Sequence, residues 1–252
     1  MAEKFKFSYL EYIREVTSGK VPVCKMAKLA VKRHVSDLKK SKAGTFPYYF
    51  DQKKAQSAII FFSLLVHTKG KLAGQKLKPE PWQQFIIAMI YGWRRVDNNK
   101  RRFRKAYIQV ARKNGKSFLA AGVSLYDLIT EPGAEVYSAA TKKDQARIVF
   151  DDAKKTVQYS KDLKKYIKPL AHSLTCADGS MKPLASDSNT LDGLNPSCAI
   201  IDEYHAHKTT ELIDVIDTGM RARQQPLMFI ITTAGNNRNA PCFEEYENCK
   251  KL

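Results

Sequence analysis

The segment 110–117 carries residue types that can bind phosphate, and it reads Val-Ala-Arg-Lys-Asn-Gly-Lys-Ser. It follows a short apolar run that begins at Ala106, and it precedes a helix-like run that begins at Phe118. A loop of this kind between a strand and a helix directs backbone N–H groups and the positive helix N-terminus towards a phosphate group. We therefore expect Lys116 to contact the β- and γ-phosphates of a nucleotide, and the Ser117 hydroxyl to hold Mg²⁺.

One residue departs from the usual pattern of such loops, which open with glycine. Val110 occupies that place, and a β-branched residue disfavours the tight glycine turn. The chain is therefore expected to enter this loop differently. On local sequence alone, a chance Gly-Lys-Ser in a basic loop remains the alternative interpretation.

A second acidic element follows further along the chain. Residues 199–203 read Ala-Ile-Ile-Asp-Glu, an apolar strand that ends in two carboxylates. In a nucleotide hydrolase, the first carboxylate supports Mg²⁺ and the second polarises the attacking water. These roles fall on Asp202 and Glu203. Acids at an exposed strand end are the alternative, but the order of both elements within one α/β pattern favours a nucleotide site.

Two further motifs are weaker. Thr232, Thr233 and Gly235 end an apolar strand with hydroxyls and a small residue, which could sense a γ-phosphate by hydrogen bonding. Gln83 follows Pro81-Trp82, and its amide carries the donor and acceptor that an adenine edge requires. Taken alone, an ordinary strand end and solvent-facing amides explain both.

The surrounding elements must position these residues. Helical spacing occurs over 8–42, 51–66, 82–93, 142–159 and 209–220, and strands are predicted over 106–110, 135–140, 197–201 and 227–232. Strands that alternate with helices from residue 106 onward indicate a parallel sheet covered by helices.

Composition restricts the class of protein. The chain has 252 residues, a net charge of +18 and five cysteines without CxxC spacing. Residues 1–116 hold 27 of the Lys and Arg against 7 Asp and Glu, so the whole positive excess lies there. Such an excess favours a polyanion partner, with segments 69–78 and 100–105 as candidates, although a solvated lysine-rich surface explains it equally well. We expect reduced thiols, no signal peptide, no membrane span and a cytosolic protein.

These elements resemble the large terminase subunit of tailed bacteriophages, the motor ATPase that pumps DNA into the capsid. The resemblance covers nearly the whole chain. It rests on the segments already quoted and on Tyr91-Gly92-Trp93, Arg102-Phe103-Arg104, Ile201-Asp202-Glu203-Tyr204-His205, Arg223-Gln224-Gln225-Pro226-Leu227 and Thr232-Thr233-Ala234-Gly235.

The resemblance implies an α/β fold, a P-loop NTPase of the additional-strand conserved-glutamate type. Its mainly parallel central sheet is flanked by helices and preceded by an N-terminal helical segment. The expected domains are a basic helical segment, 1–78, and the ATPase core, 79–252. No nuclease domain and no nuclease activity are expected in this chain. The implied cofactors are ATP and Mg²⁺.

The resemblance also implies roles for individual residues. Gln83 would recognise adenine, Thr232, Thr233 and Gly235 would couple hydrolysis to DNA movement, and Glu203 and Lys116 would be catalytic. Arg112 would sense or stabilise the γ-phosphate. Arg223 would complete a neighbouring subunit's site, with Arg221 and Arg147 as alternatives. Nucleotide binding is expected at Gln83, Arg112, Lys113, Asn114, Gly115, Lys116, Ser117 and Phe118, and metal binding at Ser117 and Asp202.

The implied partners are double-stranded DNA, the portal protein, the small terminase subunit and further copies of the chain in a ring, in the host cytoplasm. An isolated subunit could be a monomer. Two other functions compete with this one. A helicase-like nucleic-acid-stimulated ATPase shares the nucleotide motifs but requires a second lobe, and a DNA-binding module with a degenerate nucleotide site would not need Lys116, Asp202 and Glu203.

Overall fold

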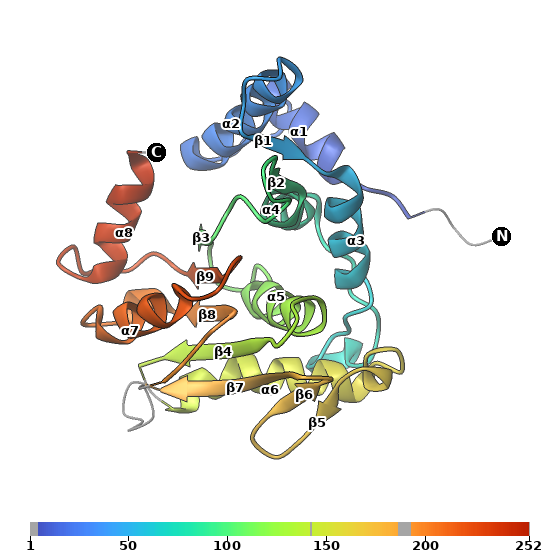
Figure 1. Ribbon diagram of the computed structural model, residues 1–252, viewed down its shortest axis with the longest axis vertical. Helices are drawn as coiled ribbons and strands as arrows, with labels where there is room; N and C mark the ends of the chain where they lie inside the picture. Colours follow the sequence, from blue (N-terminus) through green and yellow to red (C-terminus); the bar gives the residue numbers. More distant parts are fainter. Residues whose placement is uncertain (1–4, 142, 186–192, 252) are drawn as a thin grey trace. The chain divides into compact units, whose positions relative to one another are not determined.

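The structure is a computed structural model that describes residues 5–141, 143–185 and 193–251. It divides into two compact units (Figure 1). The first unit consists of Met1–Ser63 and Leu77–Phe103, and the second of Leu64–Lys76 and Arg104–Leu252. The chain therefore passes from one unit to the other three times. The boundary that the sequence predicts after residue 78 stays a prediction.

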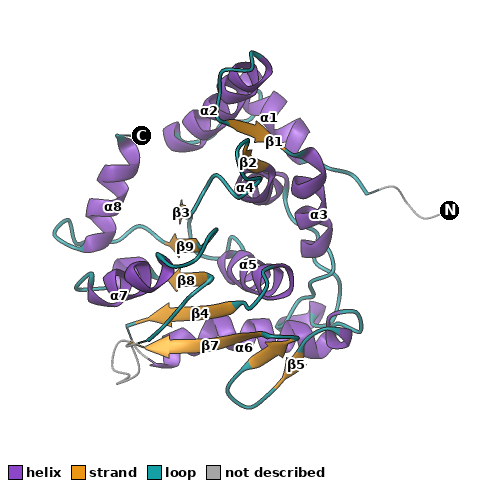
Figure 2. Ribbon diagram, viewed as in Figure 1, coloured by secondary structure: helices purple, strands orange, loops and turns teal. Residues whose placement is uncertain are grey.

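The first unit is mainly helical (Figure 2). Its α3 begins after Asp51, whose side chain accepts a hydrogen bond from the backbone N–H of Lys54 at 3.0 Å. Its α4 begins at a proline, which lacks the N–H that a first turn leaves unpaired. The elements are α1 (Tyr9–Ser18), α2 (Lys25–Lys42), β1 (Tyr48–Phe50), α3 (Gln52–Phe62), α4 (Pro81–Gly92) and β2 (Trp93–Arg95), with β1 antiparallel to β2.

Helix α3 is shorter than the sequence predicts. It ends at Phe62, whereas the apolar run suggested a helix that continues to Val66. In the second unit, Val66 instead forms an antiparallel bridge with Lys76. A run of apolar residues alone does not distinguish a helix end from a buried extended segment.

The second unit is built on a seven-stranded sheet in the described part of the chain, with strand order β3-β9-β8-β4-β7-β6-β5. The first five strands in this order are parallel, and β6 and β5 join antiparallel at the far edge. The strands are β3 (Lys105–Gln109), β4 (Glu135–Ala140), β5 (Lys168–Pro169), β6 (Leu174–Cys176), β7 (Gly179–Ala185), β8 (Cys198–Asp202) and β9 (Leu227–Thr232). Strand β9 thus lies between the strand before the phosphate loop and the strand that ends in Asp202, as expected of an additional-strand P-loop fold.

Helices cover both faces of this sheet. Helix α5 (Lys116–Thr130) packs on α6 (Lys143–Tyr159), and both contact β4 and β7. The other face packs on α7 (Glu211–Met220) through a core that includes Ile216, Ala199 and Ile201. Successive strand side chains point to opposite faces, so an apolar run such as β8 can fill both cores. Helix α8 (Pro241–Lys250) ends the described chain, and short 3-10 turns lie at Gly70–Leu72, Leu163–Lys165 and Tyr204–Ala206.

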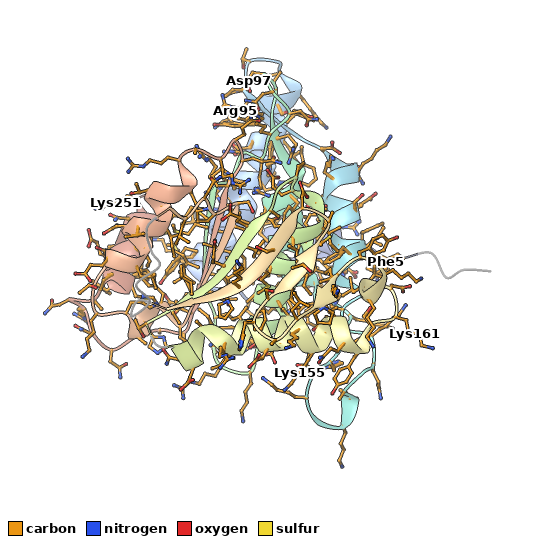
Figure 3. All side chains as sticks on the ribbon, turned by 60° about the horizontal axis from the view of Figure 1, so that its bottom comes forward. Phe5, Arg95, Asp97, Lys155, Lys161 and Lys251 are labelled. Carbon is orange, nitrogen blue, oxygen red and sulfur yellow. The ribbon has the colours of Figure 1, made fainter. Side chains whose placement is uncertain are left out.

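Exposed lysines lie on the surface of the second unit. Lys155 and Lys161 are exposed and extend away from the protein (Figure 3). Among the described residues, every helix is too short or too polar to cross a lipid bilayer.

Candidate nucleotide-binding site

The phosphate loop connects β3 to α5, and Val110 explains how it begins. The Val110 N–H donates to the carbonyl oxygen of Thr232 at 3.0 Å, so Val110 still belongs to the ladder between β3 and β9. The loop therefore turns after Val110. Two later residues supply the left-handed backbone, Lys113 with φ 64° and Gly115 with φ 75°. A β-branched residue is tolerated at the opening because no tight turn is formed there.

The loop is stabilised from within. The Asn114 side-chain amide donates to the carbonyl oxygens of Ala111 and Arg112, at 3.3 and 3.1 Å. Gly115 accepts the first helical hydrogen bond of α5, from the N–H of Leu119. Lys116 and Ser117 are the first two residues of that helix, where free N–H groups and the helix dipole favour an anion.

The acidic pair lies at the carboxyl end of β8. Asp202 is the last residue of the strand, and its Oδ1 accepts from the Glu203 N–H at 2.8 Å. Burial, followed by the charge of Glu203, raises the pKa of Asp202 to about 6. Glu203 has left-handed backbone with φ 49°, which is unusual for a residue with a side chain and reverses the chain towards the sheet edge.

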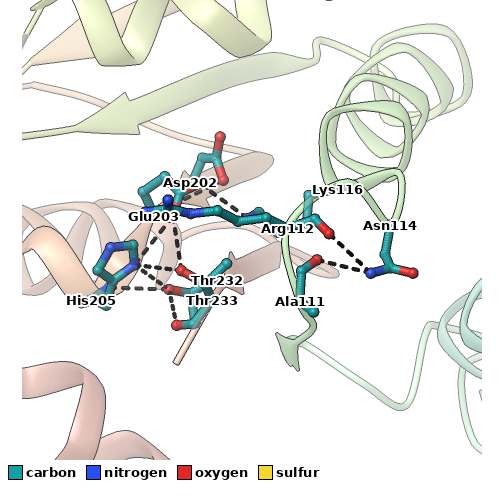
Figure 4. A network of polar contacts seen from close by, with 9 residues as sticks. All are labelled: Ala111, Arg112, Asn114, Lys116, Asp202, Glu203, His205, Thr232 and Thr233. Carbon is teal, nitrogen blue, oxygen red and sulfur yellow. Dashed lines mark hydrogen bonds and ion pairs between the residues drawn. The ribbon is translucent and has the colours of Figure 1, made fainter. Parts of the chain in front are cut away.

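The side chains of Lys116 and Glu203 meet across this edge. Lys116 Nζ lies 3.1 Å from Glu203 Oε1, and the Lys116 side chain is only 10% exposed (Figure 4). Parallel strands bring their carboxyl ends to one edge, which is why residues 87 positions apart in the sequence can pair here. The ion pair shows that the phosphate loop and the acidic pair form one cluster.

The end of β9 joins the same cluster. Thr233 Oγ1 donates to Glu203 Oε2 at 3.5 Å, and the Thr232 hydroxyl donates to the carbonyl oxygen of Thr233 at 2.9 Å. His205 lies between these groups (Figure 4), with Nδ1 3.1 Å from both Glu203 Oε2 and Thr232 Oγ1. The Gly235 backbone packs directly on His205, because a Cβ at residue 235 would lie 2.9 Å from the His205 Cβ.

A cavity of about 550 Å³ opens beside this cluster. The phosphate loop lines one side of it, and the end of β9 with the turn after β8 lines the rest. The lining residues are Ala111, Arg112, His205, Thr233, Ala234, Gly235 and Asn236. Arg112 is exposed and projects from the loop at this cavity, a position that suits an anionic ligand.

Three candidate residues lie away from the contacts that form the cluster. Gln83 belongs to the first unit, is buried, and accepts from the Glu80 N–H at 2.9 Å through Oε1, which caps α4. Phe118 is half-buried in the first turn of α5. Arg223 donates to the Asn195 carbonyl at 2.9 Å and lies 3.3 Å from Glu135 Oε1. Because Glu135 begins β4, this arginine lies at the amino ends of the parallel strands, opposite the phosphate loop. Its role stays a prediction.

Sequence reasoning missed the contribution of His205. The sequence places this residue in the segment 201–205, which resembles large terminase subunits, but it indicates no role for it. The only available signal was its spacing, two residues after Glu203 and directly beyond the strand end. A histidine in that place indicates a role only when the structure shows that Thr232 and Thr233 of β9 and the following loop contact it.

Comparison with known proteins agrees with this geometry. The family described as "Terminase large subunit, ATPase domain" matches residues 81–251. The chain belongs to this family. The ATPase domain is also 32% identical over 178 residues to the large terminase subunit of Enterobacteria phage HK97, which covers 67% of this chain and 34% of the relative. A shorter match, 54% identical over 54 residues, links it to the protein YmfN of Escherichia coli strain K12 and covers 21% of this chain and 12% of YmfN.

A solved structure shows the same fold. The crystal structure of the HK97 bacteriophage large terminase superposes with a TM-score of 0.67 and 25% sequence identity. The alignment covers 79% of this chain and 41% of the HK97 chain. The present chain therefore spans less than half the length of these terminases.

Proposed function

We propose that this chain binds ATP with Mg²⁺ and hydrolyses the terminal phosphate. The observation that carries the proposal is the cluster at the carboxyl edge of the sheet, where Lys116, Asp202 and Glu203 converge. A lysine beside a helix N-terminus suits the triphosphate, and a carboxylate on a neighbouring strand suits the attacking water. Arg112, at the cavity beside them, would stabilise charge on the γ-phosphate.

The residues present fit a magnesium ion. Ser117 and Asp202 offer oxygen atoms, the ligands that Mg²⁺ prefers. Burial disfavours the ionised form of Asp202, and a divalent cation beside it would offset that cost. Bound Mg²⁺ would neutralise charge on the phosphates. The backbone of residues 112–118 would hold the phosphates, and we retain Gln83 as the candidate for the adenine edge.

We further propose that several copies of the chain act together in an assembly. Membership in the terminase ATPase family supports a ring of copies in the host cytoplasm that moves double-stranded DNA into a procapsid, together with a portal protein and a small terminase subunit. In that ring Arg223 would act on a neighbour's nucleotide once its contact with Glu135 is released. Thr232, Thr233 and Gly235 would couple hydrolysis to DNA movement.

Two substitutions test the nucleotide site. Glu203→Gln should retain ATP binding but lose roughly 10²- to 10⁴-fold in turnover, because an amide cannot take up the proton of the attacking water. Lys116→Ala should instead weaken ATP binding itself, because it removes a positive charge from the phosphates. Phosphate release and binding of a fluorescent ATP analogue measure the two effects.

A matched control is Glu211→Gln, which changes an exposed glutamate of the same unit at the start of α7. It should leave both measurements unchanged. Wild-type turnover in the Glu203→Gln protein would contradict the assignment of the base. Unchanged ATP affinity in the Lys116→Ala protein would contradict the assignment of the phosphate loop.

A further inference from the structure

His205 contacts the Glu203 carboxylate and both threonines at the end of β9. Its Nδ1 lies 3.1 Å from Glu203 Oε2, 3.1 Å from Thr232 Oγ1 and 3.3 Å from Thr233 Oγ1. Its backbone N–H also donates to Thr232 Oγ1, at 3.1 Å. The side chain is 24% exposed, so these contacts are largely shielded from solvent.

The donors and acceptors around Nδ1 favour one tautomer of His205. The Thr232 hydroxyl already donates to the Thr233 carbonyl, so towards Nδ1 it can only accept. Ionised Glu203 Oε2 also can only accept. A bare Nδ1 would face these two acceptors at 3.1 Å and could accept only from the Thr233 hydroxyl, at 3.3 Å. The tautomer with a proton on Nδ1 suits this network better, because it lets His205 donate to the pair of oxygens while the Thr233 hydroxyl donates to Glu203.

The coupling segment, residues 232–235, is tied to His205 in a second way. The Gly235 backbone approaches so closely that a Cβ there would meet the His205 Cβ at 2.9 Å. This separation is shorter than a side chain can tolerate, so the segment and the histidine are in direct van der Waals contact. A displacement of Gly235 towards His205 must therefore move the histidine.

The opposite oxygen of Glu203 has a different partner. Glu203 Oε1 pairs with Lys116 Nζ at 3.1 Å, and a triphosphate would attract that lysine away from the carboxylate. Glu203 Oε2 would keep its contacts to His205 and Thr233. The hydrogen bonds on the Oε2 side are then the ones that determine where the carboxylate lies when the water attacks the terminal phosphate.

We propose that His205 is a positioning residue that holds the Glu203 carboxylate to the coupling segment, so that the place of the catalytic base depends on the place of residues 232–235. This inference rests on the proposed function of the site. It assigns to one side chain the physical link between the hydrolytic carboxylate and the segment expected to respond to DNA.

Two substitutions of His205 separate its hydrogen bond from its volume. His205→Phe fills similar space without a donor, whereas His205→Asn places an amide donor close to the Nδ1 position. Loss of a hydrogen bond to a charged group should lower kcat of the Phe variant by roughly 10- to 100-fold. The KM for ATP and the affinity for a fluorescent ATP analogue should stay within about twofold, and Asn should restore most of the kcat.

The matched control is His67→Asn. His67 belongs to the same unit, and its backbone forms hydrogen bonds with residues 74 and 75. This variant should keep the wild-type kcat. A kcat of the Phe variant equal to wild type would overturn the proposal, and so would an Asn variant as slow as Phe. A parallel loss of nucleotide affinity would indicate a merely structural role and would also overturn it.

A second measurement does not depend on hydrolysis. In histidine-labelled protein, imidazole ¹H–¹⁵N correlations should show a proton on His205 Nδ1, and Thr232→Val should shift that signal. A bare Nδ1 would contradict the proposal. If the Phe variant does not fold, Thr233→Val, which removes one hydroxyl contact to both Glu203 and His205, should show the same kcat loss at constant KM, and wild-type kcat would overturn the link.

A different result would show that the proposed ATPase function itself is wrong. In that case the assembled wild-type protein would not hydrolyse ATP at all, while the Nδ1 signal and its response to Thr232→Val would still be present. If the wild-type protein hydrolyses ATP and the His205 variants keep its kcat, the proposed function stands and only the role of His205 is contradicted.

Discussion

Arg102 illustrates how a side chain can differ in role from its neighbours in a basic segment. It belongs to the run 100–105, which the sequence offers as a candidate for DNA contact. In the structure its guanidinium lies 2.7 Å from Asp37 Oδ2 and is only 16% exposed. It also stacks over four aromatic rings, those of Phe46, Tyr48, Trp93 and Phe103. These contacts make Arg102 a structural residue of the first unit and correct its place among the DNA candidates.

We predict that Arg102→Ala destabilises the protein. Asp37 is 5% exposed and would lose its closest cation, and the removal of one partner from a buried ion pair costs about 3 kcal/mol. Lost packing on the aromatic rings adds to this. Urea unfolding should show a lower free energy of unfolding for this variant. Arg14→Ala, which truncates an exposed arginine of α1, should change stability little, and equal effects of the two would contradict this account.

At the scale of elements, α2 is attached to β2 by a buried histidine. His34 Nδ1 accepts from the Trp93 indole N–H at 3.1 Å, and its ring packs edge-on against Phe50, Phe85 and Trp93. Burial lowers the pKa of His34 to about 4, although nearby Asp37 acts in the opposite direction. The accepting role of Nδ1 requires that this nitrogen stays without a proton.

This lowered pKa predicts an acid-sensitive first unit. The neutral form is favoured in the folded state, so the contribution of His34 to stability is complete above pH 6.5. It is lost as the pH falls from about 6.5 to about 4, by an amount on the order of 3 kcal/mol at the lower end. The free energy of unfolding, measured by urea at pH 7 and pH 5, should fall more in wild type than in His34→Gln. Equal falls would contradict the prediction.

The order of the main strands and helices of the second unit was predictable. Apolar runs such as 227–232 appear as strands at the predicted residues, because a strand buried on both faces needs no polar alternation. The cluster of Lys116, Asp202 and Glu203 at one edge followed from the same reasoning, since parallel strands bring their carboxyl ends together.

Other elements could not be predicted from the sequence. Strand β7 carries Pro183 and no β-branched residue, and both features argue against a strand next to the sheet centre. The structure tolerates Pro183 because β6 pairs with β7 only as far as Met181, so one side of residue 183 lacks a ladder partner among the described strands. The contacts of His205 were hidden for a similar reason, because they depend on β9, whose residues are 27 positions away.

At the scale of the whole molecule, the basic residues of the segment 1–116 fall into two groups. Some are buried or ion-paired, and others are exposed to solvent. Arg102 is ion-paired and Arg101 is 5% exposed, whereas Lys71, Lys76 and Lys78 are exposed. Lys69 is ion-paired with Asp152, with Nζ 3.0 Å from Oδ1. The exposed lysines of the segment 69–78 are therefore better candidates for DNA phosphates than Arg101 and Arg102.

We predict that DNA binding by the assembled protein depends steeply on salt and partly on these lysines. Each phosphate contact releases counterions and adds a slope of about −0.9 to the logarithm of affinity against the logarithm of salt concentration. Replacement of Lys71, Lys76 and Lys78 by Gln should flatten the slope, measured with random duplexes. As a matched control, Lys164, Lys165 and Lys168 are replaced by Gln. These lysines lie in the half of the chain without positive excess, so their replacement should flatten the salt slope less. Equal flattening, or no DNA binding at low salt, would contradict the prediction.

The three passages of the chain between its two units limit how the molecule can be divided. No continuous piece contains one unit alone, since a piece that holds all of the first unit also carries residues 64–76 of the second. A protein that began at residue 104 would lack Leu65, which is buried in the second unit, and would leave the buried Asp152 without Lys69. An unpaired buried carboxylate is costly. A shortened protein that keeps the whole second unit must therefore begin at or before residue 64, and it then also carries residues 77–103 of the first unit.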